Sequence, residues 1–282
     1  MGFDLISAEK TSLVQEYKAL HNTGLHSLHP LIIDLYYSHR TNQWNRVETV
    51  NGEGLVIGPM RGTYYAYVPG PDIPERFHSL PIKCHSNKRV IFGEDLGSYE
   101  EVVYPFADIN RREKYTSKKS FYNATRAPGS YARKHGLELS IRQDNSSIDL
   151  PELIDLYDKW TEQKVQRGVH RISFPVSRYK RVFSKVTLLP YLKTIEARID
   201  GNLVAFRTVL LDTNTAFDLV FVQDYDCPNG LSNAFNYLSL MRLWQQCDYD
   251  INWFNCGVSD GDLKAFKQQF PNYVVSCYRV RR

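Results

Sequence analysis

Cysteine is scarce in this sequence, and the cysteines that are present are not arranged in pairs. There are five, an odd number, and no two are spaced as Cys-x-x-Cys. His26 and His29 form a His-x-x-His pair, but no further ligand pattern accompanies them. A disulfide framework and a zinc site are therefore not expected, and the sequence predicts no metal and a reducing, cytoplasmic location.

Long hydrophobic runs are also missing. The longest apolar stretches, at residues 31–37 and 203–211, are interrupted and too short to span a bilayer. The first residues have neither the basic start nor the apolar run of a signal peptide. We therefore expect a soluble protein without a transmembrane segment.

Glycine (16) and proline (13) are too few for a fibrous or low-complexity chain. Aromatic residues, in contrast, make up 13% of the sequence, which is enough to build a core and excludes intrinsic disorder. A length of 282 residues predicts one large domain or two of ordinary size. The net charge of +4 excludes no class of partner by itself.

The second half shows a regular order of elements. Asp149, Pro151 and Glu152 are typical of a helix start, and an apolar helical face follows them. Asp200-Gly201-Asn202 is a strong hairpin signal between two strand-like runs. The full prediction is a helix from 149, strands at 194–199, 203–211 and 215–222, a helix from 231 to 244, a strand at 251–255, a helix at 259–270 and a strand at 273–280.

The first half shows weaker signals of the same kind. The prediction is a helix at 8–20 followed by strands at 46–51, 55–58, 63–68, 90–92 and 102–104. The composition turns polar and basic near residues 110–116, where we expect a junction. The repeated order of a helix followed by antiparallel strands predicts an α+β protein with a degenerate structural duplication.

The element order of the second half resembles that of the GCN5-related N-acetyltransferase (GNAT) superfamily. Three segments are similar to one branch, the Fem-type peptidyltransferases and the C-terminal domain of lysylphosphatidylglycerol synthases. These are the basic segment 118–126 with 133–136, Asp200-Gly201 with 204–206, and 254–257 with 263–267. The resemblance covers roughly residues 115–282. One departure is Ala127-Pro128-Gly129, which interrupts the basic helix and leaves its continuity open.

The resemblance implies a mixed, mostly antiparallel sheet flanked by helices. It implies a GNAT-like transferase domain at residues 113–282 and a degenerate GNAT-like domain at residues 1–112. In this fold the donor and the acceptor meet where two strands splay apart, here 215–223 and 251–255. The resemblance also implies that Lys267 stabilises the oxyanion of a tetrahedral intermediate. The alternative is that Lys267 lies on the wet face of its helix.

Several polar residues near these strands are candidates for the site. Asp218 is the only acid within the third strand of the meander and is suited to orient or deprotonate an amine, as is Asp224 at the strand end. Ordinary exposed strand positions are the alternative. Cys256 has no evident base and is expected to be a small buried residue. The substrate-binding candidates are Asn255, Ser259, Asp260, Asn233, Tyr122 and Arg126; helix capping explains Ser259 equally well.

The segment at 223–233 bears on the donor. It has one glycine, Gly230, and two acids, Asp224 and Asp226, whereas a pyrophosphate needs bare backbone N–H groups. Acyl-CoA is therefore a less favoured donor, and no tightly bound cofactor is expected. Aminoacyl-tRNA, which the Fem-type resemblance implies, or another acyl carrier agrees better with this segment.

Two segments concentrate positive charge. Residues 111–142 hold nine Lys or Arg against two acids, and residues 164–185 hold seven and no acid. Tyrosine and phenylalanine are interleaved in the first, a pattern that suits tRNA or another nucleic acid, although a solvated face is the alternative. The polyanion-binding candidates are Lys118, Lys119, Arg133, Lys134, Arg171 and Arg178.

The sequence as a whole predicts an acyl or aminoacyl transferase that moves an activated acyl group to an amine acceptor. Two alternatives stay open. One is a nucleic-acid-modifying acyltransferase whose acceptor is a modified base, and the other is a non-catalytic module that binds nucleic acid or protein. The donor, the acceptor and the oligomeric state are not set by the sequence.

Overall fold

The computed structural model describes residues 47–49, 55–60, 63–68, 82–86, 94–142, 150–169, 175–184, 191–212, 214–248, 250–259 and 266–281. The predicted helix at 8–20 and the predicted strand at 90–92 lie outside these residues. The chain divides into two compact units, one of Met1–Val102, Gly257–Lys264 and Val274–Arg282, the other of Val103–Cys256 and Ala265–Tyr273. The expected boundary at residue 112 falls inside the second unit.

Unit 1 contains a series of strands. They are β1 (Val47–Thr49), β2 (Leu55–Met60), β3 (Thr63–Val68), β4 (Ile82–Ser86), most of β5 (Glu94–Pro105) and most of β11 (Tyr273–Arg281). β1, β2 and β3 pair in antiparallel order, β3 pairs with β4 in parallel, and β4 pairs with β11 antiparallel. The strands predicted at 46–51, 55–58, 63–68, 102–104 and 273–280 are confirmed in their described residues, whereas a GNAT-like origin of this unit stays a prediction.

Unit 2 is built on a mixed sheet. Its strands are β6 (Glu138–Arg142), β7 (Leu192–Ile199), β8 (Asn202–Asp212), β9 (Thr215–Gln223) and β10 (Trp253–Ser259), whose last residues belong to unit 1. β6 to β9 pair antiparallel in sequence order, and β10 pairs with β9 in parallel. Asp200 and Gly201 have φ values of 50° and 79°, as a tight two-residue hairpin requires. The predicted three-stranded meander is thus confirmed.

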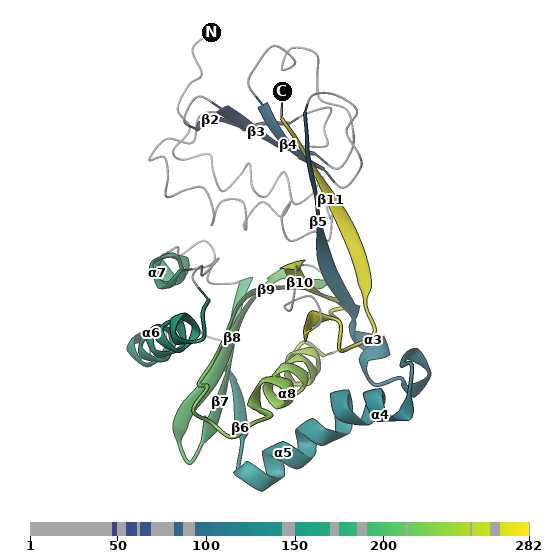
Figure 1. Cartoon of the computed structure of the whole chain (residues 1–282), viewed down its shortest axis with the longest axis vertical. Coiled ribbons are helices and arrows are strands. Elements are labelled where there is room, and N and C mark those ends of the chain that lie inside the picture. The colour runs from purple at the N-terminus through teal and green to yellow at the C-terminus, as the bar shows by residue number, and fades with distance from the viewer. Residues whose placement is uncertain are drawn as a thin grey trace. The chain divides into compact units, whose positions relative to one another are not determined.

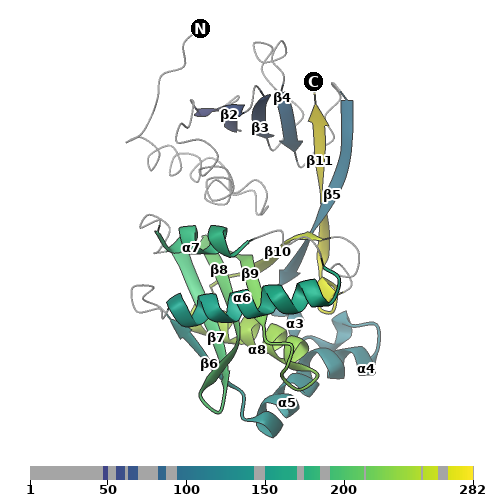
Figure 2. The same cartoon turned by 60° about the vertical axis from the view of Figure 1, so that its left-hand side comes forward.

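Helices cover both faces of the unit 2 sheet (Figures 1 and 2). α6 (Leu150–Gln166) and α7 (Val176–Ser184) lie on one face, and α8 (Leu231–Gln246) lies on the other. On the first face, Tyr157 of α6 and Tyr179 of α7 pack against Phe206 of β8. α8 buries Leu231, Phe235, Leu240 and Leu243, the apolar positions at helical spacing in its sequence.

The basic segment forms one helical body that packs on α8. After α3 (Phe106–Ile109) and η3 (Arg112–Lys114), it runs through α4 (Lys118–Phe121), the π-helical turn η4 (Tyr122–Arg126) and α5 (Ala127–His135). Ser117 and Ser120 form a capping box at its start. The helix continues through Ala127-Pro128-Gly129 because the wider π turn just before Pro128 accommodates the proline ring.

The end of the chain is described in part. Ser259 is the last residue of β10, so this strand continues beyond the predicted end at Asn255. Residues 260–265, where the predicted helix would begin, lie outside the described residues. Of the helix predicted at 259–270, Phe266 and Lys267 are helical, whereas residues 268–270 form a turn and a bend, so the helix ends earlier than predicted. Within the described part of the chain, no helix is both long and apolar enough to cross a membrane.

The end of α5 allows a test of the fold. Gly136 ends this helix with φ 61°, a left-handed conformation that costs a residue with a side chain about 1 kcal/mol. We expect Gly136→Ala to lower the free energy of unfolding, measured in urea, by that amount. Gly129→Ala, in the helix interior, is the matched control and should raise it by about 0.5–1 kcal/mol. Equal effects of both substitutions would contradict this description of the helix.

Candidate functional site

The parallel pairing of β9 and β10 ends after three residue pairs. The last pair is Asn255 with Phe217, so Cys256 and Asp218 are the next residues along the two strands. β9 also carries a bulge there, since Val209 of β8 pairs with Asp218 and Thr208 pairs with Val220. The sheet is therefore irregular where the sequence predicts that donor and acceptor meet, and bulges of this kind often re-aim side chains at active sites.

A buried arginine lies next to Asp218, at the end of the parallel pairing. Arg207 of β8 is 2% exposed, and its guanidinium donates to Ser239 Oγ (2.8 Å) and to Asn236 Oδ1 (2.5 Å) of α8. Its Nε lies 3.4 Å from Asp218 Oδ1. The rings of Phe221 and Phe254 lie 4.8 and 5.1 Å from the guanidinium carbon. These contacts compensate the cost of burying the charge and join α8 to the strands.

Asp218 is held next to Arg207 and is largely buried. Its side chain is 13% exposed. Burial raises the pKa of Asp218 above the usual aspartate value, while the positive charges of Arg207 and Lys267 oppose that rise. A carboxylate with a raised pKa is a stronger base than an ordinary aspartate.

Hydrogen bonds hold both the side-chain ammonium and the backbone carbonyl of Lys267. Its Nζ donates to the carbonyl oxygen of Cys256, the first residue of β10 beyond the paired segment. Its own carbonyl accepts a hydrogen bond from the Tyr104 hydroxyl. Tyr104 is buried and packs edge-on against Phe270 and stacks with Phe254. The ammonium of Lys267 therefore lies where β9 and β10 part.

The Cys256 thiol is not an activated nucleophile. Burial raises the pKa of Cys256 to about 12, although the Lys267 charge opposes the rise. The thiol is therefore protonated at neutral pH. This agrees with the expectation of a small buried residue.

The other candidates at this end of β10 are placed as follows. Asn255 is fully buried in the strand. Ser259 lies at the end of β10, and Asp260 lies outside the described residues. Their roles in substrate binding stay predictions.

Asp224 belongs to a different cluster, at the loop between β9 and α8. Its Oδ2 accepts from Lys159 (2.8 Å) of α6, and its Oδ1 accepts from Gln163 (3.0 Å) and from the Asp226 amide (3.0 Å). Burial alone would raise the pKa of Asp224, but these hydrogen bonds outweigh it and hold the pKa below the usual value. The described contacts of Asp224 fix the loop to α6 and do not bring it to Asp218 or Lys267.

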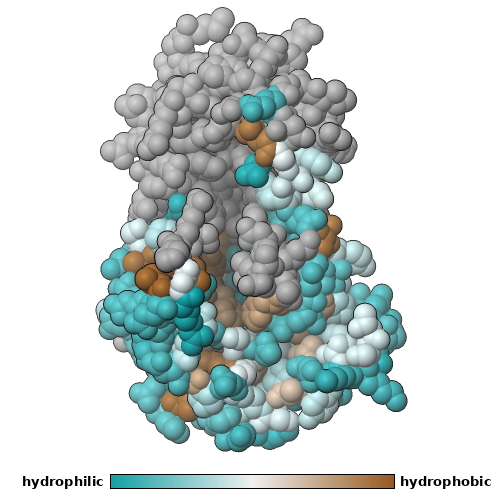
Figure 3. Space-filling model, viewed as in Figure 1, coloured by the Kyte–Doolittle hydropathy of each residue, from teal (hydrophilic) through white to brown (hydrophobic). Residues whose placement is uncertain are grey.

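The basic candidates gather on the α4–α5 helical body. Hydrophilic residues predominate over these helices on the face shown in Figure 3. Tyr122, 54% exposed, lies among them. The exposed cations there are Lys118, Lys119, Arg126, Arg133 and Lys134. Arg178 lies apart on α7 and is half-buried, and Arg171 lies outside the described residues. Asn233 is exposed in the first turn of α8.

Sequence reasoning missed two residues that contact the candidate residues Asp218 and Lys267. Arg207 had a signal, because it is the lone charge in the apolar run at 203–211. Tyr104 had none, since its bond to Lys267 joins residues 163 positions apart. No group of His, Cys, Asp or Glu suited to hold a metal occurs among the described residues.

The sequence matches no protein-family model and no curated protein. Solved structures, however, share its fold. The C-terminal domain (DUF2156) of a putative lysylphosphatidylglycerol synthetase from Agrobacterium fabrum superposes with a TM-score of 0.63 at 13% identity, covering 96% of this chain and 92% of that one. L-PGS from Bacillus licheniformis gives 0.64 at 14%, covering 99% and 93%. FemX gives 0.59 at 10%, covering 99% and 97%.

Identities this low show the fold alone. The chain has an α+β, GNAT-like fold of the kind that FemX and the lysylphosphatidylglycerol synthetase domain share. The resemblance found in the sequence is confirmed at this level.

The Arg207–Asp218 pair gives a second test. We expect Arg207→Met to lower the free energy of unfolding by about 3–5 kcal/mol, because it leaves a buried carboxylate without its partner. Arg207→Met combined with Asp218→Leu should cost clearly less than the sum of the two single changes, measured by urea unfolding at pH 7. Lys159→Met removes a surface ion pair of a 46% exposed lysine and should cost about 1 kcal/mol or less. Additive losses would refute the pairing.

Proposed function

We propose that the protein is an acyl transferase, most specifically an aminoacyl transferase, whose reaction takes place where β9 and β10 part. The observation that carries this proposal is that Asp218 and Cys256, whose carbonyl accepts from Lys267, are the first residues beyond the parallel pairing. The fold shared with FemX and with a putative lysylphosphatidylglycerol synthetase supports it, since the latter name denotes an aminoacyl product.

Lys267 is proposed to stabilise the oxyanion. Attack of an amine on an acyl carbonyl places negative charge on the carbonyl oxygen, and a fixed ammonium in a water-poor site lowers the energy of that charge. One of the three Lys267 protons is used by the Cys256 carbonyl, which orients the group.

Asp218 is proposed to accept a proton. The amine nitrogen forms a bond to the acyl carbon, one of its protons passes to the Asp218 carboxylate, and the bond between the carbon and the carrier oxygen or sulfur breaks. The carrier then leaves with that proton. The raised pKa of Asp218 suits both steps, because it makes the carboxylate a better base and the carboxyl group an acid of moderate strength.

The donor is proposed to be aminoacyl-tRNA or another acyl carrier, with acyl-CoA less favoured. The loop between β9 and α8, which would have to cradle a pyrophosphate, is tied to α6 through Lys159 and Gln163. The exposed cations of α4 and α5 favour a polyanionic carrier. The same face supports the second candidate, a non-catalytic nucleic-acid binding module.

The transfer itself is tested with Lys267→Ala. Radiolabelled aminoacyl-tRNA or acyl-CoA is incubated with the full chain and primary amines, and both transfer and donor hydrolysis are measured. We expect wild-type turnover of one donor and a loss of about 10²–10³-fold in Lys267→Ala, as for removal of an oxyanion donor. Lys180→Ala, an exposed lysine on α7, is the matched control and should retain wild-type rates.

Absence of any transfer or hydrolysis in the wild type would overturn the enzymatic proposal. If salt-sensitive binding of tRNA were then retained, with affinity falling steeply between low and high salt, the binding-module candidate would stand in its place.

The role of Asp218 predicts a pH dependence. Asp218 accepts a proton only while it is ionised, so the rate should fall as the pH drops through its pKa. Because burial raises this pKa, the acid limb should lie above about 3.9, the usual aspartate value. Asp218→Asn should remove the limb and lower the rate about 10²–10⁴-fold. Asp226→Asn, at a largely exposed position, should leave the profile unchanged; a limb that persists in Asp218→Asn would assign the base elsewhere.

A further inference from the structure

Lys267 is the last residue of a helical stretch. Residues 268–271 form a turn and bends and do not continue the helix. The last carbonyl groups of a helix have no partner within it, and helix ends fray. The position of Lys267 therefore depends on contacts from outside its own helix.

Tyr104, at the end of β5, supplies one such contact. Its hydroxyl donates to the Lys267 carbonyl, which is one of these terminal carbonyls. Tyr104 is 1% exposed, so water does not compete for this bond. Loss of the hydroxyl would leave a carbonyl at the end of the helix without this partner, which costs free energy in a buried place.

The ring of Tyr104 is held by two phenylalanines from different segments. It stacks on Phe254 of β10, with centroids 6.0 Å apart and planes 12° apart. It meets Phe270, three residues after Lys267, edge-on at 5.3 Å and 85°. The same side chain thus contacts β10 and the segment that carries Lys267. Because the Lys267 ammonium donates to the Cys256 carbonyl of β10, Tyr104 fixes both ends of that contact.

The Tyr104 hydroxyl stays a hydrogen-bond donor at any pH used for an assay. Burial raises the pKa of Tyr104 well above its usual value, and the neighbouring Cys256 adds to the rise, while Arg207 opposes it. The phenol is therefore protonated throughout the neutral range, and its bond to Lys267 does not depend on pH.

We propose that Tyr104 is a positioning residue for the transfer, whose hydroxyl holds the backbone of Lys267 so that the ammonium stays at the end of the β9–β10 pairing. Tyr104 acts through Lys267. The proposal rests on the proposed function in one respect, that Lys267 stabilises the oxyanion. Positioning matters for such a group because a misplacement of about 1 Å can cost about 100-fold in rate.

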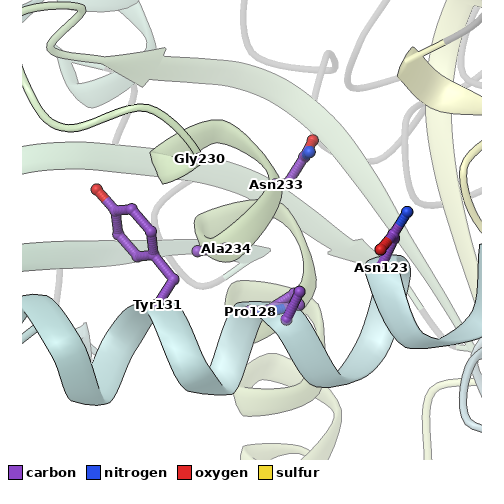
Figure 4. A pocket seen from close by; sticks show the side chains of 7 residues that line it. Asn123, Pro128, Tyr131, Gly230, Asn233 and Ala234 are labelled. Atoms are coloured by element: carbon purple, nitrogen blue, oxygen red, sulfur yellow. The ribbon is translucent and has the colours of Figure 1, made fainter.

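Two other tyrosines of unit 2 provide matched controls. Tyr115 is buried, and its hydroxyl donates to the Ile109 carbonyl (2.6 Å). The Tyr131 hydroxyl donates to the Pro228 carbonyl (3.0 Å), and its ring lines a small pocket of about 260 Å³ between α5 and the first turn of α8 (Figure 4). The contacts described for these two hydroxyls do not involve Lys267. A phenylalanine at either position removes the same kind of hydrogen bond from a different place.

The first test compares Tyr104→Phe with Tyr115→Phe and Tyr131→Phe in the full chain. Phenylalanine keeps the ring contacts and removes the hydroxyl. In the transfer assay we expect Tyr104→Phe to lower kcat about tenfold and to leave KM within about twofold, because the donor is bound as before and only the oxyanion is stabilised less well. Both controls should retain wild-type rates, although Tyr115→Phe should lower the urea midpoint as much as Tyr104→Phe does.

A double-mutant cycle separates positioning from a general structural role. If Tyr104 acts through Lys267, Tyr104→Phe should cause no further loss of rate in the Lys267→Ala background, which has already lost about 10²–10³-fold. Losses that multiply would show that Tyr104 supports the fold in general, and they would overturn the proposal.

Chemical labelling tests the positioning without turnover. The rate at which an N-hydroxysuccinimide ester modifies Lys267 is measured by mass spectrometry after digestion of the labelled full chain, with the exposed Lys180 as internal reference. An amine held by a hydrogen bond reacts more slowly than a released one. We therefore expect the labelling of Lys267 to be faster in Tyr104→Phe than in the wild type, and unchanged in Tyr115→Phe.

The proposed function and the positioning role fail separately. If the wild type transfers an acyl group and Tyr104→Phe does so at the same rate, the proposed function stands and the positioning role falls. If the wild type shows no transfer, the proposed function falls. Faster labelling of Lys267 in Tyr104→Phe than in Tyr115→Phe then supports the hold of Tyr104 on Lys267, and equal labelling overturns it.

Discussion

The arrangement of unit 2 depends on one buried guanidinium. Arg207 contacts α8 through Asn236 and Ser239, β9 through Asp218, and the ring of Phe254 in β10. A charge that is 2% exposed is tolerated only where acceptors and ring faces surround it. Because these partners come from three elements, a shift of any of them would leave the charge uncompensated. The position of α8 on the sheet and the position of Asp218 at the end of the parallel pairing are thereby coupled.

α8 contributes residues both to the contacts with Arg207 and to the lining of the small pocket. Its inward polar residues, Asn236 and Ser239, bind Arg207, while Asn233 and Ala234 in its first turn line the small pocket. The loop before α8 is tied to α6 through Asp224 and Lys159. The helix that binds Arg207 is thus the same helix that forms one wall of the pocket.

Ion pairs with Lys159 change the interpretation of the two acidic residues in the loop between β9 and α8. In the sequence, Asp224 and Asp226 stand as two acids that would repel a pyrophosphate. In the structure Lys159 lies 2.8 Å from Asp224 and 2.9 Å from Asp226, so part of that charge is neutralised. The net charge of the loop is therefore not the main argument against a bound pyrophosphate. The main argument is that α6 holds the loop in place and that the loop has a single glycine.

The sequence by itself determined the local elements of unit 2 and their order. Asp200-Gly201 specified a hairpin because few residues adopt positive φ, and the apolar spacing of α6 and α8 specified their buried faces. It also suggested Asp218 and Lys267 as candidate site residues, the latter through a family resemblance, and their roles stay predictions. Only the tertiary structure decided that Arg207 and Tyr104 join them, that Asp224 fixes a loop, and that the helix continues through Pro128. The physical reason is that a buried charge or hydroxyl needs a polar partner, and that partner often comes from a distant element of the chain. Tyr104 and Lys267, which form a hydrogen bond, are 163 positions apart. The local sequence around either residue therefore does not indicate the contact.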